Sequence, residues 1–433
     1  MKKKVISAVL TTAMVASMMV GTGVTSVSAE TDNDEDVTIT YWGWDSDFYE
    51  PMFAAYEEEH PNVHFEPTAV EWGDMLTKAQ QALASGSELP VMIAMDNTLI
   101  ENWKDMDICE DLKQYGFDET QYLDDLAEKT VTDDGKVIGV ESSINPSGIA
   151  YKRDLAKKYF GTDDPDELFQ IFNSFDAYAE EGSEVYEQTD GKVHLFHSGQ
   201  SVAEMLYFES SVQNMDGNTL NYTDKMTDIM STLIKLRDAN AVDTYQNGTP
   251  EANATYSDDS HIFYPCPNWS INYYIKGNDP EGSGNWGLMH APVDYNCGGS
   301  AHGITKDATD AQKQAAYDFL IWTSEGDGAS ILRDKANFIT PYKKYVEDSE
   351  FTGVSDEDIE FFGGEDIGKL FYQEISPNMV SVPSTKWDNS MVNVRNDVAQ
   401  QLMDDTSMGL DEAISIGKDE ITQLVTDTDI TIK

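Results

Sequence analysis

Tryptophan, carboxylate and amide side chains gather where predicted strands of this 433-residue chain end. Trp44 and Asp45 follow the first predicted strand, and Asp96 and Asn97 close another. In open α/β sheets, ligands bind outside the carboxyl ends of the strands, so these positions mark a candidate site. An indole ring packs on the C–H face of a sugar, while carboxylate and amide groups hydrogen-bond its hydroxyls. The pattern therefore favours a sugar-binding site.

A third position of this kind lies further along the chain. Pro265 and Pro267 stiffen a turn that carries Asn268 and Trp269, and we expect this turn to join a strand to a helix. Taken alone, each tryptophan fits a hydrophobic core equally well. The three positions together favour a ligand site.

Alternating strands and helices are predicted to position these residues. Segments 37–42, 63–67 and 91–95 are β-branched or apolar and predict strands, whereas 45–59 and 72–84 have helical spacing. This order is typical of an α/β sheet with helices on both faces. Further helices are predicted at 150–159, 202–212, 226–237, 311–324 and 410–425.

Sequence motifs of the common enzyme classes are absent. The chain has no nucleophile elbow, no P-loop, no zinc-protease motif and no dinucleotide-binding glycine motif. Its seven histidines are dispersed without metal-ligand spacing, so we expect neither a metal nor a cofactor. The sequence predicts a binding protein rather than an enzyme. Because carboxylates are abundant, a secreted glycoside hydrolase remains the alternative.

The charge of the chain excludes some partners. There are 79 acidic and 28 basic residues, which give a formal net charge of −51. Such a surface repels nucleic acid and anionic lipid headgroups, and it argues against a large anionic ligand. We interpret the acidity as a solubility feature.

The N-terminal segment has the order of a secretory signal peptide. Lysines precede a largely apolar run over 5–20, and small residues up to Ala29 fit a cleavage site. The expected mature chain therefore begins at Glu30, with an acidic leader over 30–36, and is secreted. A retained anchor helix is the alternative.

Three cysteines, Cys109, Cys266 and Cys297, are too few for a disulfide framework or a zinc site. At most one bridge can form, and Cys266 with Cys297 is the favoured pair. Three free thiols fit the sequence equally well.

Fragments along nearly the whole expected mature chain resemble one known family. The chain is similar to the extracellular solute-binding proteins of sugar ABC transporters, the family 1 group that includes the maltose-binding protein. Val91 departs from its pattern, which usually has Asp there. Thr22 stands where a lipid-anchored member carries the lipobox cysteine, so no lipid anchor is expected at that site. The matching fragments are 37–67, 89–96, 135–141, 147–154, 267–269, 286–292, 298–304 and 315–323.

The resemblance implies a fold and a function. The fold would be two α/β lobes joined by hinge crossings around an interlobe cleft, with lobe one at 37–143 plus 300–342 and lobe two at 144–299 plus 343–433. The protein, expected to be a monomer, would capture a sugar or oligosaccharide in the cleft and deliver it to the permease of an ABC import system. A binder of the same fold for another solute, such as a polyamine, is a second alternative.

Carried over to this sequence, the resemblance implies sugar contacts at the Trp44–Asp45 turn, at Asp96 and at Trp269. It adds Glu141, a further aromatic wall from Trp387 and a polar contact from Gln200. With Asn97 and Asn268, the full candidate set is Trp44, Asp45, Asp96, Asn97, Glu141, Gln200, Asn268, Trp269 and Trp387.

Overall fold

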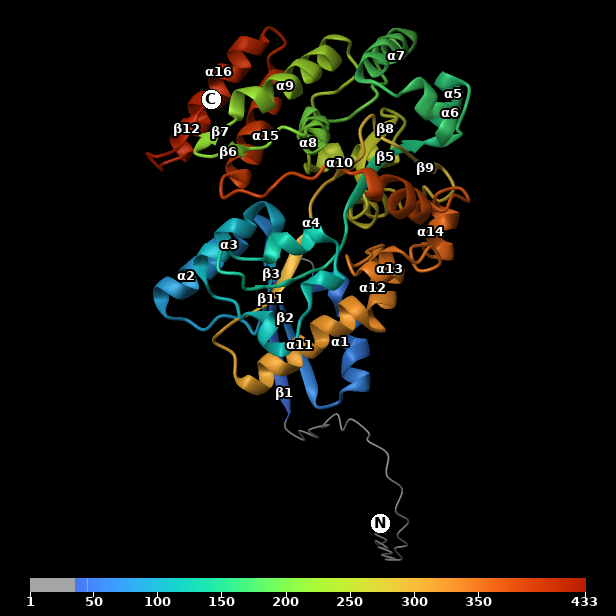
Figure 1. Cartoon of the computed structure of the whole chain (residues 1–433). Helices are drawn as coiled ribbons and strands as arrows, with labels where there is room; N and C mark the ends of the chain where they lie inside the picture. The colour runs from blue at the N-terminus through green and yellow to red at the C-terminus, as the bar shows by residue number, and fades with distance from the viewer. Residues whose placement is uncertain (1–35, 45) are drawn as a thin grey trace, which may run out of the picture. The chain divides into compact units, whose positions relative to one another are not determined.

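The computed structural model describes residues 36–44 and 46–433 (Figure 1). The predicted signal peptide with its cleavage site, the acidic leader up to residue 35 and the candidate site residue Asp45 lie outside the described residues.

A five-stranded mixed sheet carries the first hydrophobic core. Its strand order is β2 (Val63–Ala69), β1 (Val37–Gly43), β3 (Met92–Asp96), β11 (Ser300–Ile304) and β4 (Val140–Glu141). β1 runs parallel to β2 and β3, whereas β11 is antiparallel to β3 and β4. Every residue of β3 is buried, as its nearly wholly apolar sequence predicts. The three strands predicted in this region are confirmed.

Helices α1 (Ser46–Glu59), α2 (Met75–Ser85), α11 (Asp310–Glu325) and α12 (Gly328–Ala336) belong to the same core. α1 and α11 pack on the edge of the sheet formed by β1 and β2 (Figure 1). The predicted helix over 72–84 begins as a 3-10 turn, and α2 ends at Gly86, whose φ of 69° closes the helix in the left-handed region. The helices predicted at 45–59 and 311–324 are confirmed.

The second sheet is antiparallel throughout. β5 (Pro146–Lys152) pairs with β8 (Phe263–Pro267), β9 (Trp286–Met289) and β10 (Tyr295–Asn296). The helix predicted over 150–159 is therefore wrong at its start, since α5 spans Arg153–Phe160. Residues 149–151 are fully buried between β8 and β9, and this packing outweighs the helix propensity of alanine.

Four long helices pack together beside this second sheet. They are α8 (Gly199–Glu209), α9 (Tyr222–Asp238), α15 (Asp388–Asp404) and α16 (Leu410–Leu424). The helices predicted at 226–237 and 410–425 are confirmed. The helix predicted at 202–212 is confirmed with a shift, because it begins at Gly199 after the Ser198 cap and stops at Glu209.

The remaining elements complete the chain, and a third core cluster lies around the π-helical segments Ile271–Lys276 and Lys369–Ile375. The other elements with helix or strand labels are α3 (Ile100–Met106), α4 (Asp124–Ala127), α6 (Pro165–Ile171), α7 (Phe175–Gln188), α10 (Pro250–Ala254), α13 (Lys343–Val346), α14 (Asp356–Phe361), β6 (Met215–Asp216), β7 (Thr219–Leu220) and β12 (Thr431–Ile432). Within the described part of the chain, no helix is long and apolar enough to cross a membrane.

The chain passes between the two large cores three times. The first core draws on 37–140 and 301–338, and the second on 149–297 and 391–425. We call the two parts lobe one and lobe two, and we assign 37–143 plus 300–342 to lobe one and 144–299 plus 343–433 to lobe two.

The crossing segments are hydrogen-bonded to one another. Ser142 N donates to the Ser300 carbonyl at 2.8 Å, and Ile144 N donates to the Ile339 carbonyl at 2.8 Å. Several adjoining segments therefore form the connection between the two lobes.

All three cysteines are buried and free. The favoured Cys266–Cys297 bridge is thus wrong, and the alternative of three thiols is confirmed. Burial raises the pKa of the Cys109 and Cys266 thiols to about 12 and that of Cys297 well above its ordinary value. Buried thiols of this kind are inert, since the thiolate is the reactive form.

We therefore expect a thiol reagent at pH 8 to leave all three cysteines of the native protein unmodified over minutes. The same reagent should titrate three thiols after denaturation without reductant. The measurement is the absorbance of the chromophore that the reagent releases when it reacts with a thiol. A single titratable thiol in the denatured, unreduced protein would show that a disulfide had formed.

Candidate functional site

A cavity of about 350 Å³ is lined by residues of both lobes. This volume lies within the range of roughly 300–1,000 Å³ that is typical of small-molecule sites. We call it the interlobe cavity. Its most prominent feature is a set of aromatic rings, contributed by Trp44, Trp72, Phe208, Trp269, Tyr273, Tyr274 and Phe338.

Trp269 stands where the two lobes meet. It follows β8 and precedes the helical turn that begins at Ile271, so the predicted strand-to-helix turn is confirmed. Its ring packs against both large cores, and its indole nitrogen donates to the Cys297 carbonyl at 2.9 Å. A Cβ on Gly298 would lie 2.9 Å from that nitrogen, and φ is 93° there, so glycine lets the chain pass behind the ring.

Asp96 lines the cavity at the end of β3, as predicted. Its Oδ1 accepts a hydrogen bond from the Thr98 backbone nitrogen at 2.7 Å, and the side chain of Trp72 is hydrogen-bonded to the same carboxyl. Burial raises the pKa of Asp96, and these hydrogen bonds oppose the rise. The carboxyl is therefore held in one orientation beside an aromatic ring.

Asn97 and Glu141 are not among the residues that line the interlobe cavity. The Asn97 amide donates to Glu141 Oε2 at 3.1 Å, and the Asn97 backbone nitrogen donates to the Gly299 carbonyl at 3.1 Å. Glu141 is only 3% exposed, and burial raises its pKa to about 7 against the opposing charge of Lys129. Asn97 thus links the end of β3 to Glu141 of β4 and to the Gly299 carbonyl.

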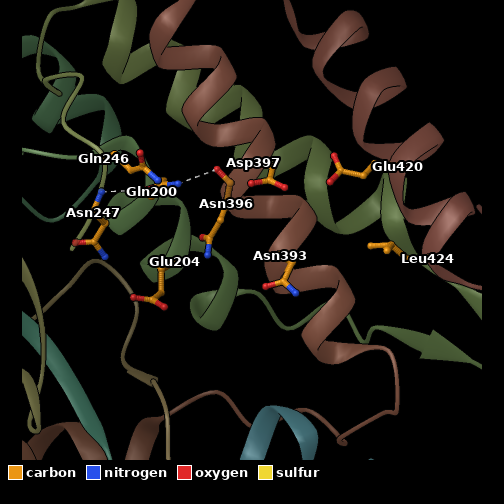
Figure 2. Close-up of a pocket in the computed structure, with 9 residues that line it drawn as sticks. All are labelled: Gln200, Glu204, Gln246, Asn247, Asn393, Asn396, Asp397, Glu420 and Leu424. Atoms are coloured by element: carbon orange, nitrogen blue, oxygen red, sulfur yellow. Dashed lines mark hydrogen bonds between the residues drawn. The ribbon is translucent and has the colours of Figure 1, made fainter. Parts of the chain in front are cut away.

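The remaining candidates lie in different places. Trp44 lines the interlobe cavity. Asn268 is fully buried, and its amide bonds to backbone carbonyls and a tyrosine hydroxyl, so we reassign it from sugar contact to structural support. Trp387 packs on the core of lobe two and does not line this cavity. Gln200 lines a separate cavity (Figure 2).

Sequence reasoning missed much of the wall. Trp72 is 39% exposed and follows the carboxyl end of β2, so the strand-end argument used for Trp44 would have found it. Glu204 and Phe208 lie four residues apart on α8, a spacing that helical cores share. No signal in the sequence separates them from core positions.

The polar groups of the interlobe cavity are carboxyls, hydroxyls and one amide. Asp96 and Glu204 supply the carboxyls, while Ser142, Ser143 and Asn145 supply hydroxyl and amide groups. No lysine, arginine or histidine is among the described residues of its wall. No group of three or more metal-binding side chains occurs within 36–44 and 46–433. The site suits a ligand that has hydrogen-bond donors and apolar faces and carries no negative charge.

Replacing Glu141 with glutamine should change the pH dependence of stability. Between its ordinary pKa of 4.5 and the raised value of about 7, folded Glu141 holds a proton that the unfolded chain has lost. The wild type thus loses stability as the pH rises through this window, by about 3 kcal/mol at most. Glu141→Gln should match the wild type near pH 4.5 and exceed it at pH 8 in denaturant unfolding. Exposed Glu58→Gln is the control, and identical pH profiles for Glu141→Gln and wild type would refute the assignment.

Both the amino-acid sequence and the fold of this chain match known proteins. The family model described as bacterial extracellular solute-binding protein matches residues 51–360. A crystal structure of an extracellular solute-binding protein of family 1 has a TM-score of 0.74 and 19% identity, covering 89% of this chain and 99% of its own. No curated protein sequence matches the chain.

Two further solved structures share the two-lobed fold. The ABC transporter-associated binding protein of B. animalis subsp. lactis Bl-04, in complex with β-1,6-galactobiose, has a TM-score of 0.72 and 18% identity, covering 92% of this chain and 99% of its own. The galacto-N-biose/lacto-N-biose I-binding protein of Bifidobacterium longum has a TM-score of 0.72 and 17% identity, covering 93% and 100%. These neighbours are binding proteins rather than enzymes. Because the family model matches well over half of the residues of this chain, the chain belongs to the bacterial extracellular solute-binding protein family.

Proposed function

We propose that this protein captures a sugar or oligosaccharide in the interlobe cavity and delivers it to the permease of an ABC import system. The observation that carries the proposal is the wall of the cavity, where aromatic rings from both lobes surround carboxyl, hydroxyl and amide groups without a basic side chain. Sugars present apolar C–H faces and hydroxyl edges, and this wall offers a partner for each. Structural neighbours in complex with galactobiose and lacto-N-biose support the same class of ligand.

Binding would use both lobes at once. Trp44, Trp72 and Asp96 come from lobe one, whereas Trp269 and Tyr273 come from lobe two. A ligand held between them stabilises the closed state, because the open state lacks one half of the contacts. The hydrogen-bonded crossing segments restrict the motion to a hinge. The closed form is the one that we propose to dock on the permease.

We infer that the protein binds its ligand without chemical turnover, as expected for this family. The expected processing supports delivery outside the cytoplasm: cleavage after Ala29, secretion, and no lipid anchor at Thr22. We further propose that it acts as a monomer and needs no cofactor.

Truncation of Trp72 tests the cavity with little risk to the fold, because this ring is 39% exposed. Trp72→Ala should weaken sugar affinity about tenfold, since an aromatic contact in a desolvated cleft contributes about 1–2 kcal/mol. Tyr245→Ala is the matched control, since Tyr245 is 36% exposed and does not line the cavity. Its affinity should stay within about twofold of the wild type.

The measurement is calorimetry with maltose, β-1,6-galactobiose, lacto-N-biose, xylobiose and spermidine, followed by chromatography of each sugar after long incubation. We expect at least one sugar to bind and to return unchanged. Binding of spermidine alone would favour a polyamine binder, and reproducible cleavage of a sugar would favour a glycoside hydrolase. Equal affinity of wild type and Trp72→Ala would place the site elsewhere.

A further inference from the structure

A second cavity, of about 540 Å³, adjoins the interlobe cavity within lobe two. Apart from Leu424, its wall is made of amide and carboxyl side chains (Figure 2). We call it the amide cavity. The interlobe cavity carries the aromatic rings, whereas no aromatic side chain is among the described residues of the amide cavity.

Two helices connect the cavities. On α8, Gln200, Glu204 and Phe208 recur every four residues and therefore share one face. Phe208 lines the interlobe cavity, Gln200 lines the amide cavity, and Glu204 lines both. On α15, Val392 lines the interlobe cavity and the adjacent Asn393 lines the amide cavity. The two cavities thus share Glu204, and neighbouring residues of α8 and α15 line one or the other.

The amide cavity contains both hydrogen-bonded side chains and side chains with free hydrogen-bonding groups. Gln200 holds the wall together, because its Nε2 donates to the Asn396 carbonyl at 3.2 Å and its Oε1 accepts from the Asn247 backbone nitrogen at 2.9 Å (Figure 2). In contrast, the side chains of Asn393 and Gln246 make no hydrogen bond to another described residue. Each offers one acceptor and two donors to a ligand.

The charge of this cavity limits what it can hold. Glu204, Asp397 and Glu420 line it, and no basic side chain is among the described residues of its wall. Asp397 and Glu420 face each other between α15 and α16 (Figure 2). Burial and the hydrogen bond to Asp397 raise the pKa of Glu420. An anionic group would be repelled here, whereas neutral hydroxyl groups would find donors and acceptors.

We propose that the amide cavity binds the distal residues of a neutral oligosaccharide whose first residues stack in the interlobe cavity. The inference rests on the proposed function and extends it, because it makes the ligand an oligosaccharide rather than a monosaccharide or disaccharide. The distal residues are held edge-on by amides instead of face-on by aromatic rings. Sugars with carboxylate, sulfate or phosphate groups at the distal end are excluded.

The test uses oligosaccharide ladders of one to six units, built as α-1,4-glucan, β-1,4-xylan and β-1,6-galactan, and calorimetry of the full chain. Affinity should rise up to a length that fills the interlobe cavity and rise again when the ligand enters the amide cavity. The double variant Asn393→Ala/Gln246→Ala should lose about three- to tenfold affinity for the long members, since each lost amide hydrogen bond is modest. For the short members its affinity should equal that of the wild type.

The control variant is Gln213→Ala/Asn218→Ala, which removes an exposed glutamine and an exposed asparagine of lobe two outside both cavities. Glu204 is left intact, because Arg395, which is 1% exposed, has its charged partner there at 3.5 Å. Affinities of the double variant equal to wild type at every length, with sugars still bound, would overturn this inference and leave the proposed function standing. Absence of any sugar binding would overturn both.

Discussion

The geometry of the site depends on one buried amide, that of Asn268. Its Nδ2 donates to the Ile144 carbonyl at 3.1 Å and to the Asn337 carbonyl at 3.3 Å. Its Oδ1 accepts a hydrogen bond from the Trp269 backbone nitrogen at 2.9 Å. The Ile144 carbonyl belongs to the first segment that passes between the lobes, whereas the Asn337 carbonyl lies near the end of the second segment of lobe one. Without the amide, both would lose a buried partner. One fully buried side chain of lobe two is therefore bonded to the first crossing segment, to lobe one and to the backbone of Trp269, whose ring packs on both cores.

Burial also determines the pKa values of the carboxyl groups in and near the interlobe cavity. Burial raises the pKa of Asp96 and of Glu141, and a chain with a net charge of −51 has few basic side chains to oppose that rise. A ligand hydroxyl beside Asp96 replaces water as a hydrogen-bond donor without bringing a charge into the cleft. A neutral polyhydroxyl ligand thus fits this site, whereas an anion would add repulsion to the cost of desolvation.

The sequence predicted the first α/β unit well, because β1, β2 and β3 have strong β-branched or apolar patterns and lie next to their helices in the chain. It also predicted Trp44, Asp96 and Trp269 at strand ends, and the structure brings these three to one cavity. It failed where tertiary packing decides the outcome. Asn268 was predicted to contact the sugar because it stands beside Trp269 in the predicted strand-to-helix turn, yet its amide bonds to distant carbonyls that no local pattern reveals. The same limit applies to Phe208 and Glu204, whose helical spacing equals that of core residues.

The central claim is that one neutral sugar contacts both lobes at this cavity. Backbone hydrogen exchange, measured by mass spectrometry with and without a saturating sugar, tests it most directly. The account predicts slower exchange around Asp96 and Ser142 in lobe one and around Trp269 and Gly298 in lobe two, all in the same sugar titration. Slower exchange confined to one lobe, or only at segments that line neither cavity, would contradict it.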